Sequence, residues 1–175
     1  LTGGAYAQDQ SSSLKDAYSK HFSIGTALSA TQIEGKEPGT LELVKQQFNA
    51  VTAENVMKWE IIEPVEGQFN FAAADAMIAY AEANNIKVIG HVLLWHEQTP
   101  DWVFLDDKGQ TASKELVLSR LKNHINAVMG RYKGRIQGWD AVNEALNEDG
   151  TLRQSNWYKA LGEDYIATVF ELAHQ

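Results

Sequence analysis

The residues best able to do chemistry in this sequence gather at the ends of short apolar runs. The segment WDAVNEALNEDG, residues 139–150, places Asn143 and Glu144 directly after such a run. A carboxylic acid beside an amide suits general acid/base work on a neutral polar substrate, provided that burial or a second carboxylate raises the pKa of the acid. By position alone, a glutamate in an acidic chain is more often a solvated loop residue. Glu144 is therefore a candidate whose case depends on the fold.

Two further apolar runs are also followed by polar and aromatic residues. The run that begins at residue 50 is followed by Glu54, Asn55 and Lys58, and the run over 86–95 by Trp95, His96 and Gln98. Indole rings present flat apolar surfaces on which the C–H faces of sugars can stack. We expect Trp95, Trp102 and Trp139 to offer such surfaces. We expect Trp59 and Trp157, which lie near helix-packing positions, in the core.

The sequence gives little support for a metal, a cofactor or a serine nucleophile. His91 and His96 are five residues apart, and the two-residue period of a strand sends them to opposite faces, so we expect no metal site there. His91 shares its parity with Trp95 and is expected to point into the same site. No cysteine is present, and neither G-x-G-x-x-G nor G-x-x-x-x-G-K-[ST] occurs, so we expect no cofactor. Ser29 and Thr52 lack a nucleophile-elbow context, which disfavours a serine hydrolase.

From residue 14 onward, apolar runs alternate with segments of helical period. The runs predict strands in 21–28, 50–59, 86–95 and 135–143, and the helical periods predict helices in 41–48, 74–81, 118–132 and 156–175. Four consecutive βα units imply a parallel sheet with right-handed crossovers. A doubly wound sheet and a (β/α)8 TIM barrel both fit this pattern. The missing nucleotide-binding loops favour the barrel, in which the carboxyl ends of all strands share the face that carries the active site.

Composition narrows the class of protein and of partner. The chain has 175 residues, of which 44% are hydrophobic and 22% charged, so we expect one globular domain. The net charge of −8 argues against nucleic acid or an anionic membrane as partner. No apolar run approaches the roughly 20 residues that span a bilayer. Residues 1–13 are expected to be an export-signal remnant or a disordered tail before a domain at 14–175, which predicts a secreted, periplasmic or cell-surface protein.

Three motifs together resemble one enzyme family. VTAENVMKWE, GHVLLWHEQTPDWV and WDAVNEAL, in this order and at these separations, are similar to motifs of the family 10 glycoside hydrolases, which are mostly endo-1,4-β-xylanases. The resemblance runs from about Phe22 to Gln175. It implies a (β/α)8 TIM barrel, of which this chain supplies about the first four βα units. It also implies retaining hydrolysis of β-1,4-xylosidic bonds, with xylan and xylooligosaccharides as partners.

The resemblance assigns a role to each strand-end residue. Glu144 matches the general acid/base, and Asn143 matches an asparagine that contacts the sugar 2-hydroxyl. The matched substrate-binding positions are Glu54, Asn55 and Lys58 on the glycone side, and His91, Trp95 and Gln98 beside the point of cleavage. Two positions depart from the commonest pattern: Val56, where a polar residue is frequent, and Glu97, where serine is frequent. Neither replaces a matched catalytic position.

Retention requires a second carboxyl group about 5 to 5.5 Å from the acid/base. In the family this nucleophile is a glutamate at the end of the seventh strand, so we expect it outside this chain, in the missing C-terminal half of the barrel. Strands one and four would then be open edges, and Leu93 and Val142 would lack an opposite wall. The chain alone is expected to be aggregation-prone and inactive on xylan. The alternative is a catalytically incomplete half-barrel that binds xylooligosaccharide.

Overall fold

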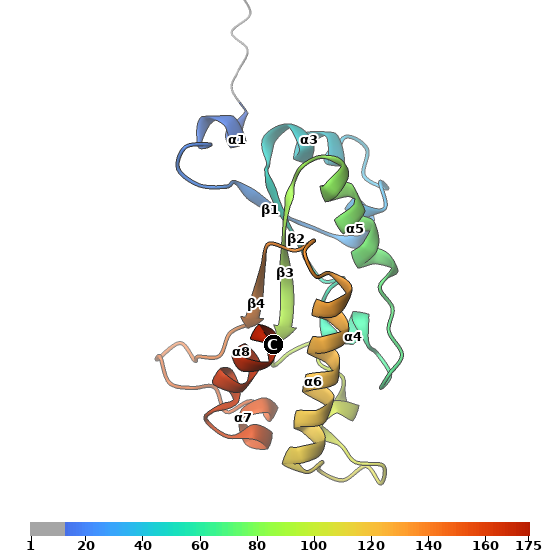
Figure 1. The fold of residues 1–175 in the computed structure, drawn as a ribbon, viewed down its shortest axis with the longest axis vertical. Helices are drawn as coiled ribbons and strands as arrows, with labels where there is room; N and C mark the ends of the chain where they lie inside the picture. Colours follow the sequence, from blue (N-terminus) through green and yellow to red (C-terminus); the bar gives the residue numbers. More distant parts are fainter. Residues whose placement is uncertain (1–12) are drawn as a thin grey trace, which may run out of the picture.

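The computed structural model describes residues 13–175 (Figure 1). The expected export-signal remnant or tail falls almost wholly on residues 1–12, which lie outside the described part. Four parallel strands form one sheet in the order β1-β2-β3-β4. Their bounds are β1 Gly25–Leu28, β2 Ala50–Ala53, β3 Lys87–Leu94 and β4 Gly138–Val142. The predicted parallel sheet is confirmed, with β1 and β4 as its edges.

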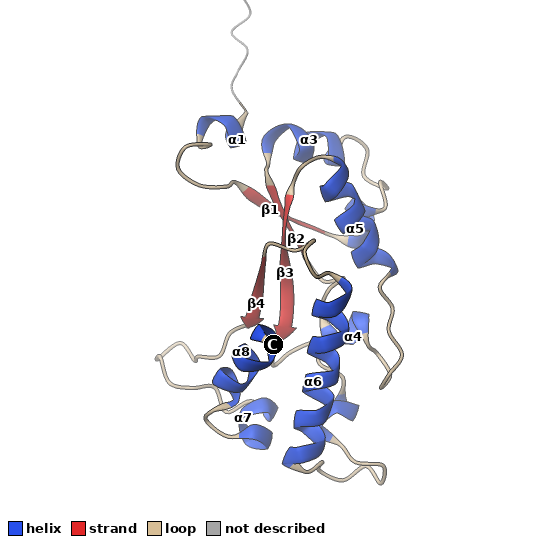
Figure 2. Ribbon diagram, in the orientation of Figure 1, coloured by secondary structure: helices blue, strands red, loops and turns tan. Residues whose placement is uncertain are grey.

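Helices follow each strand (Figure 2). They are α1 Leu14–Ala17, α2 Ala30–Ile33, α3 Thr40–Gln47, α4 Trp59–Ile62, α5 Ala72–Ala83, the 3-10 helix η1 Asp101–Phe104, α6 Lys114–Arg131, α7 Asn156–Leu161 and α8 Tyr165–His174. The single helix expected over 156–175 is wrong, because Gly162 adopts a φ of 87° and separates α7 from α8. Ser155 caps α7 as its sequence position suggests. None of the helices within residues 13–175 is long and apolar enough to cross a membrane.

Helix α6 buries most of the predicted face, with Tyr132 also buried just after the helix, and two further positions. Leu121, Ile125 and Val128 are buried as expected, but Val117 and His124 complete the buried stripe and Leu118 is only partly covered. The positions 117, 121, 124, 125 and 128 follow the helical period closely. The burial of His124 was not predicted, because the prediction of the buried face used apolar residues only and histidine is polar.

The sheet is covered by helices on one face. Helices α5, α6 and α8 pack against β2, β3 and β4. On the opposite face Ala27, Thr52 and Ile89 line an open hollow that no other described element fills. Leu93 is fully buried in the core, so the expectation that it lacks a wall is wrong. The strand ladder shifts register between His91 and Leu94, which breaks the strict alternation that the expectation assumed.

Trp139 lies near the start of β4 instead of at the carboxyl end of the strand. It pairs with Gly90 across the β3–β4 ladder, and a Cβ placed on Gly90 would come within 2.3 Å of the Trp139 ring. The ring also packs against the core, so its expected role as a sugar platform is wrong. Trp59 and Trp157 are confirmed as core residues, since both are almost completely buried.

This contact predicts the effect of one methyl group. We expect Gly90→Ala in the complete barrel to lower the free energy of unfolding by about 1 to 3 kcal/mol, because the added methyl must displace a packed indole. Gly138→Ala is the matched control, since its Cβ would meet the nearest side-chain atom, Ile89 Cδ1, at an ordinary 3.6 Å. Urea unfolding measures both variants. Equal stability of the two variants would contradict the packing described.

Candidate active site

The candidate residues lie at the carboxyl ends of β2, β3 and β4. Because the three strands are parallel and paired in sequence order, the segments that leave them start along one edge of the sheet. In Figure 1 the arrowheads of β3 and β4 point toward the same end of the molecule, where α7 lies. Residues 54–58, 95–98 and 143–144 therefore come together although they are far apart in the sequence.

Lys58 joins the segments that follow β2 and β3. Its ammonium group donates to Asn55 Oδ1 at 2.9 Å and to Gln98 Oε1 at 2.7 Å, and it lies 4.4 Å from the centroid of the Trp95 ring. The side chain is buried, so these partners replace the water that the charge loses. An ammonium group has three donors, and a third remains for a ligand hydroxyl.

Gln98 is fixed at both its backbone and its side chain. Its carbonyl accepts from the Glu60 N–H at 2.9 Å, and its side chain accepts from Lys58. The residue has a φ of 45°, in the left-handed region that side chains with a Cβ seldom adopt. Contacts at two points thus hold an unfavourable backbone conformation at the sheet edge.

The carboxylate of Glu144 is held by Trp95. The Trp95 indole N–H donates to Glu144 Oε2 at 3.0 Å, and His96 Nε2 lies 3.9 Å from the same oxygen. The Trp95 carbonyl in turn accepts from the Trp157 indole at 2.8 Å and from the Thr99 hydroxyl at 2.8 Å. About half of the Glu144 side-chain surface, 52%, stays accessible. The carboxylate is therefore oriented and still open to a ligand.

Glu54 and Asn143 are placed by their backbones. The Glu54 N–H donates to Leu28 O at 3.0 Å and the Asn143 N–H to Leu94 O at 2.9 Å, so both extend the strand ladders. Within residues 13–175 neither side chain has a hydrogen-bond partner. Their polar groups are free to meet a substrate.

His91 contacts Asp140, a residue that was not among the candidates predicted from the sequence. His91 Nδ1 and Asp140 Oδ2 are 2.9 Å apart, and the two residues are direct partners in the β3–β4 ladder. Asp140 lines the uncovered face of the sheet. Its signal in the sequence was a charge inside an apolar strand, but only the register reveals its partner. The parity argument that joined His91 to Trp95 does not hold, because three consecutive buried residues separate them.

An aromatic layer lies beneath Lys58. The Trp59 ring stacks on His124 with centroids 3.7 Å apart and planes inclined by 7°. His124 Nδ1 is 2.8 Å from Glu63 Oε2, and Glu63 Oε1 accepts from the Gly67 N–H at 2.9 Å. Burial lowers the pKa of His124, and the Glu63 carboxylate opposes that shift. The buried imidazole is part of a packed layer at the start of α4, next to Lys58.

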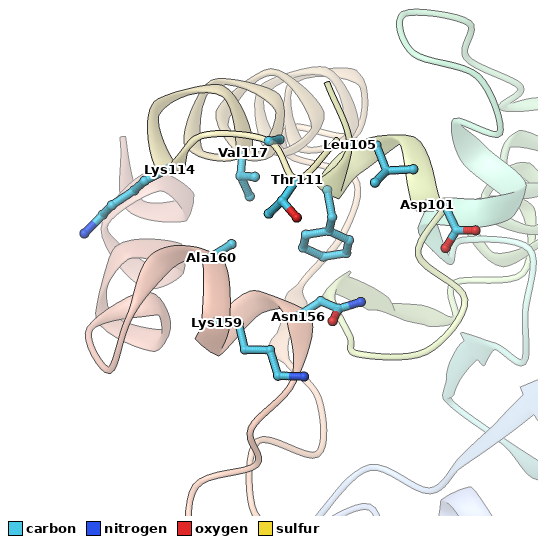
Figure 3. A pocket seen from close by; sticks show the side chains of 10 residues that line it. Asp101, Leu105, Thr111, Lys114, Val117, Asn156, Lys159 and Ala160 are labelled. Carbon is cyan, nitrogen blue, oxygen red and sulfur yellow. The ribbon is translucent and has the colours of Figure 1, made fainter. Parts of the chain in front are cut away.

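Another hollow lies apart from these residues, between η1, α6 and α7 (Figure 3). Val117 and Ala160 contribute to its apolar wall, and Thr111 and Asn156 add polar groups. No strand-end candidate lines it. Within residues 13–175, no group of three or more histidine, aspartate or glutamate side chains is placed to hold a metal ion.

Comparison with known proteins identifies relatives along nearly the whole chain. The family described as Glycosyl hydrolase family 10 matches residues 13–175. The chain is 43% identical to endo-1,4-beta-xylanase A of Xylanibacter ruminicola, over 98% of this chain and 46% of the relative. It is 44% identical to endo-1,4-beta-xylanase B of Paenibacillus barcinonensis, over 93% of this chain and 48% of the relative. The chain thus spans about half the length of the curated relatives it matches.

Solved structures agree with the sequence matches. A GH10 endoxylanase retrieved from a sugarcane soil metagenome gives a TM-score of 0.89 at 43% identity, over 92% of this chain and 47% of that one. Xylanase XynB of Paenibacillus barcinonensis, complexed with a conduramine derivative, gives 0.88 at 43% identity, over 95% and 50%. The structural relatives are (β/α)8 barrels, and the four strands described above correspond to about half of such a barrel.

The buried His124 predicts a pH dependence of stability. Because burial lowers its pKa in the folded state, the unfolded chain binds the proton first as the pH falls below about 6.5. The free energy of unfolding should therefore decrease from that pH down to the folded-state pKa and then level off with respect to this group. His124→Gln keeps a donor for Glu63 but cannot titrate, so this part of the pH dependence should disappear.

Urea unfolding of the complete barrel at about pH 7.5 and about pH 5.5 measures the change. His21→Gln is the control, since His21 is exposed and should leave the wild-type pH dependence intact. If His124→Gln and the wild type lose the same free energy between these pH values, the imidazole does not titrate as described.

Proposed function

The chain belongs to glycosyl hydrolase family 10, and on that premise we propose that it supplies the acid/base half of a retaining endo-1,4-β-xylanase. The observation that carries the proposal is the hydrogen bond from the Trp95 indole to the Glu144 carboxylate, at the strand ends where a barrel has its active site. The names of the relatives, endo-1,4-beta-xylanases of several bacteria, support xylan as the substrate.

In the proposed reaction, Glu144 moves protons and another carboxylate forms the covalent bond. The nucleophile attacks the anomeric carbon, the glycosidic C–O bond breaks, and Glu144 gives its proton to the leaving oxygen. Glu144 then takes a proton from water, whose oxygen attacks the anomeric carbon and releases the nucleophile. The Trp95 N–H donates to Oε2, and we propose that Oε1, which accepts no hydrogen bond from residues 13–175, carries the transferred proton. The nucleophile is proposed to lie on the half of the barrel that this chain does not supply.

The other strand-end residues are proposed to hold the sugar chain. Lys58 and Asn55 already form one hydrogen-bonded unit on the glycone side, with Glu54 beside them in the sequence. The proposal gives Asn143 the 2-hydroxyl contact, and places His91, Trp95 and Gln98 around the bond to be cleaved. The Lys58 ammonium lies over the Trp95 ring, so that ring has at most one face for a sugar. A neutral polysaccharide meets no repulsion from a chain of net charge −8.

We propose that the protein acts outside the cell, in the periplasm or at the cell surface. The polymeric nature of xylan supports this proposal. The sequence Ala5-Tyr6-Ala7 before a polar stretch resembles the end of an export signal, which also supports it.

Replacement of Glu144 tests the proposal directly. In the complete enzyme, Glu144→Ala should lower the turnover of xylan by about 10²- to 10⁴-fold, the usual contribution of general acid/base catalysis. An aryl xylobioside with a good leaving group needs little protonation and should still form the glycosyl-enzyme intermediate. Azide, which needs no general base, should then speed the breakdown of the intermediate. Rates of reducing-sugar release and of phenol release measure the two steps.

Glu148→Ala is the matched control, because Glu148 is an exposed glutamate on the same loop. It should hydrolyse xylan as fast as the wild type. Unchanged xylan turnover in Glu144→Ala would remove this residue from the mechanism.

A further inference from the structure

The backbone of Glu144 is held in an unfavourable conformation. Its φ of 51° lies in the left-handed region, where Cβ crowds the following carbonyl oxygen. The described residues show this conformation outside glycine at only two other positions, Asn85 and Gln98. Asparagine tolerates it well, whereas glutamate has no side-chain compensation for it. Surrounding contacts must therefore impose it on Glu144.

Arg153 makes these contacts with three consecutive carbonyl groups. Its Nε donates to Glu144 O at 3.0 Å, its backbone N–H to Ala145 O at 2.8 Å and its Nη2 to Leu146 O at 3.1 Å. The guanidinium and backbone of one residue thus fix the peptide groups that follow the candidate acid/base. The carboxylate at the other end of the same residue is held by Trp95.

The loop between Glu144 and Arg153 keeps the arginine in place. Leu146 and Leu152 form an antiparallel bridge, and the Asn147 N–H donates to Thr151 O at 2.8 Å. The Thr151 N–H donates to Asp149 Oδ1 at 3.0 Å and closes the tip. Arg153 therefore starts from a fixed point when its side chain turns back to Glu144.

Within residues 13–175 Arg153 differs from the other three arginines in lacking a carboxylate partner, although Arg120 also donates to backbone oxygens, those of Trp102 and Leu105. Arg120 pairs with Glu66, Arg131 with Asp75 and Arg135 with Glu82. Within residues 13–175 Arg153 has no carboxylate partner, and its fork is directed at backbone oxygens. The donors of a planar guanidinium are fixed relative to one another, whereas the three donors of an ammonium group rotate, so Arg153 fixes the two carbonyl groups in orientation as well as in position. Arg153 therefore holds the loop that follows Glu144 through backbone oxygens alone.

We propose that Arg153 is a positioning residue for the acid/base step. The inference rests on the proposed role of Glu144 and adds a residue that fixes the position of its carboxyl group. Arg153 fixes the peptide after Glu144, so the carboxyl group meets the leaving oxygen at the correct distance and angle. It touches neither the substrate nor the proton that is transferred.

Arg153→Lys in the complete enzyme tests the inference through the leaving group. The kcat on xylan should fall about ten- to a hundredfold with little change in KM, because a misplaced catalytic group affects the reaction step more than binding. Formation of the intermediate from a dinitrophenyl xylobioside should fall much less, because that leaving group needs little protonation. The ratio of the two rates is the decisive readout, since a loss of folded protein alone lowers both rates equally.

Arg135→Lys is the matched control, because Arg135 pairs with Glu82 near the opposite ends of the strands and should leave the ratio unchanged. If Arg153→Lys does not fold, the ratio of the two rates is measured on Arg153→Gln, which keeps one donor near the carbonyls. An unchanged ratio in the folded variant overturns the inference. Failure of both Arg153 variants to fold beside a folded Arg135→Lys also overturns it, because Arg153 would then be purely structural.

Glu144→Ala in the same assay separates this inference from the proposed function. If Glu144→Ala lowers the ratio and the Arg153 variants do not, only the positioning role fails. If Glu144→Ala leaves the ratio unchanged, the proposed function fails first.

Discussion

The hydrogen-bonded register between β3 and β4 holds two strand ends level, and the candidate site depends on that alignment. It places Trp95 beside Glu144, so that an indole N–H from one strand end meets a carboxylate from the next. The same ladder pairs His91 with Asp140 on the uncovered face of the sheet. A shift of one residue in β4 would turn Asp140 away from His91, because the side-chain period of a strand is two. Pairing of the backbone therefore determines which chemical groups can act together.

Buried polar groups support this edge from below. Lys58 carries a charge into a buried position, where Asn55, Gln98 and the Trp95 ring replace its water. Trp59, the residue after Lys58, stacks on His124 of α6. The hydrogen bonds of Lys58 and the stack of Trp59 on His124 together restrict this layer to one arrangement. This packed layer supports the candidate site residues, which lie on short loops, and keeps them in place.

The spacing of apolar residues along the sequence predicted the strands and most of the helices. Parallel strands and their polar carboxyl ends follow from alternating apolar runs, which is why the surroundings of Glu144 were expected correctly. The partner of His91 could not be predicted, because register is a long-range property. His124 was missed because histidine is polar, and its buried position becomes favourable only through two long-range contacts, the stack on Trp59 and the hydrogen bond with Glu63. The break at Gly162 was visible in the sequence, but the strong apolar pattern on both sides of it favoured one long helix.

We propose that Glu144 is the proton carrier of a retaining glycosidase, with the nucleophile on another part of the barrel. A crystal structure of the complete enzyme, trapped with a fluorinated xylobioside, measures this most directly. We predict a sugar ester on a second carboxylate outside residues 1–175, with the Glu144 carboxyl group about 5 to 5.5 Å from that carboxylate. A sugar ester on Glu144 itself, or a separation of about 6.5 to 9.5 Å typical of inverting enzymes, would contradict it.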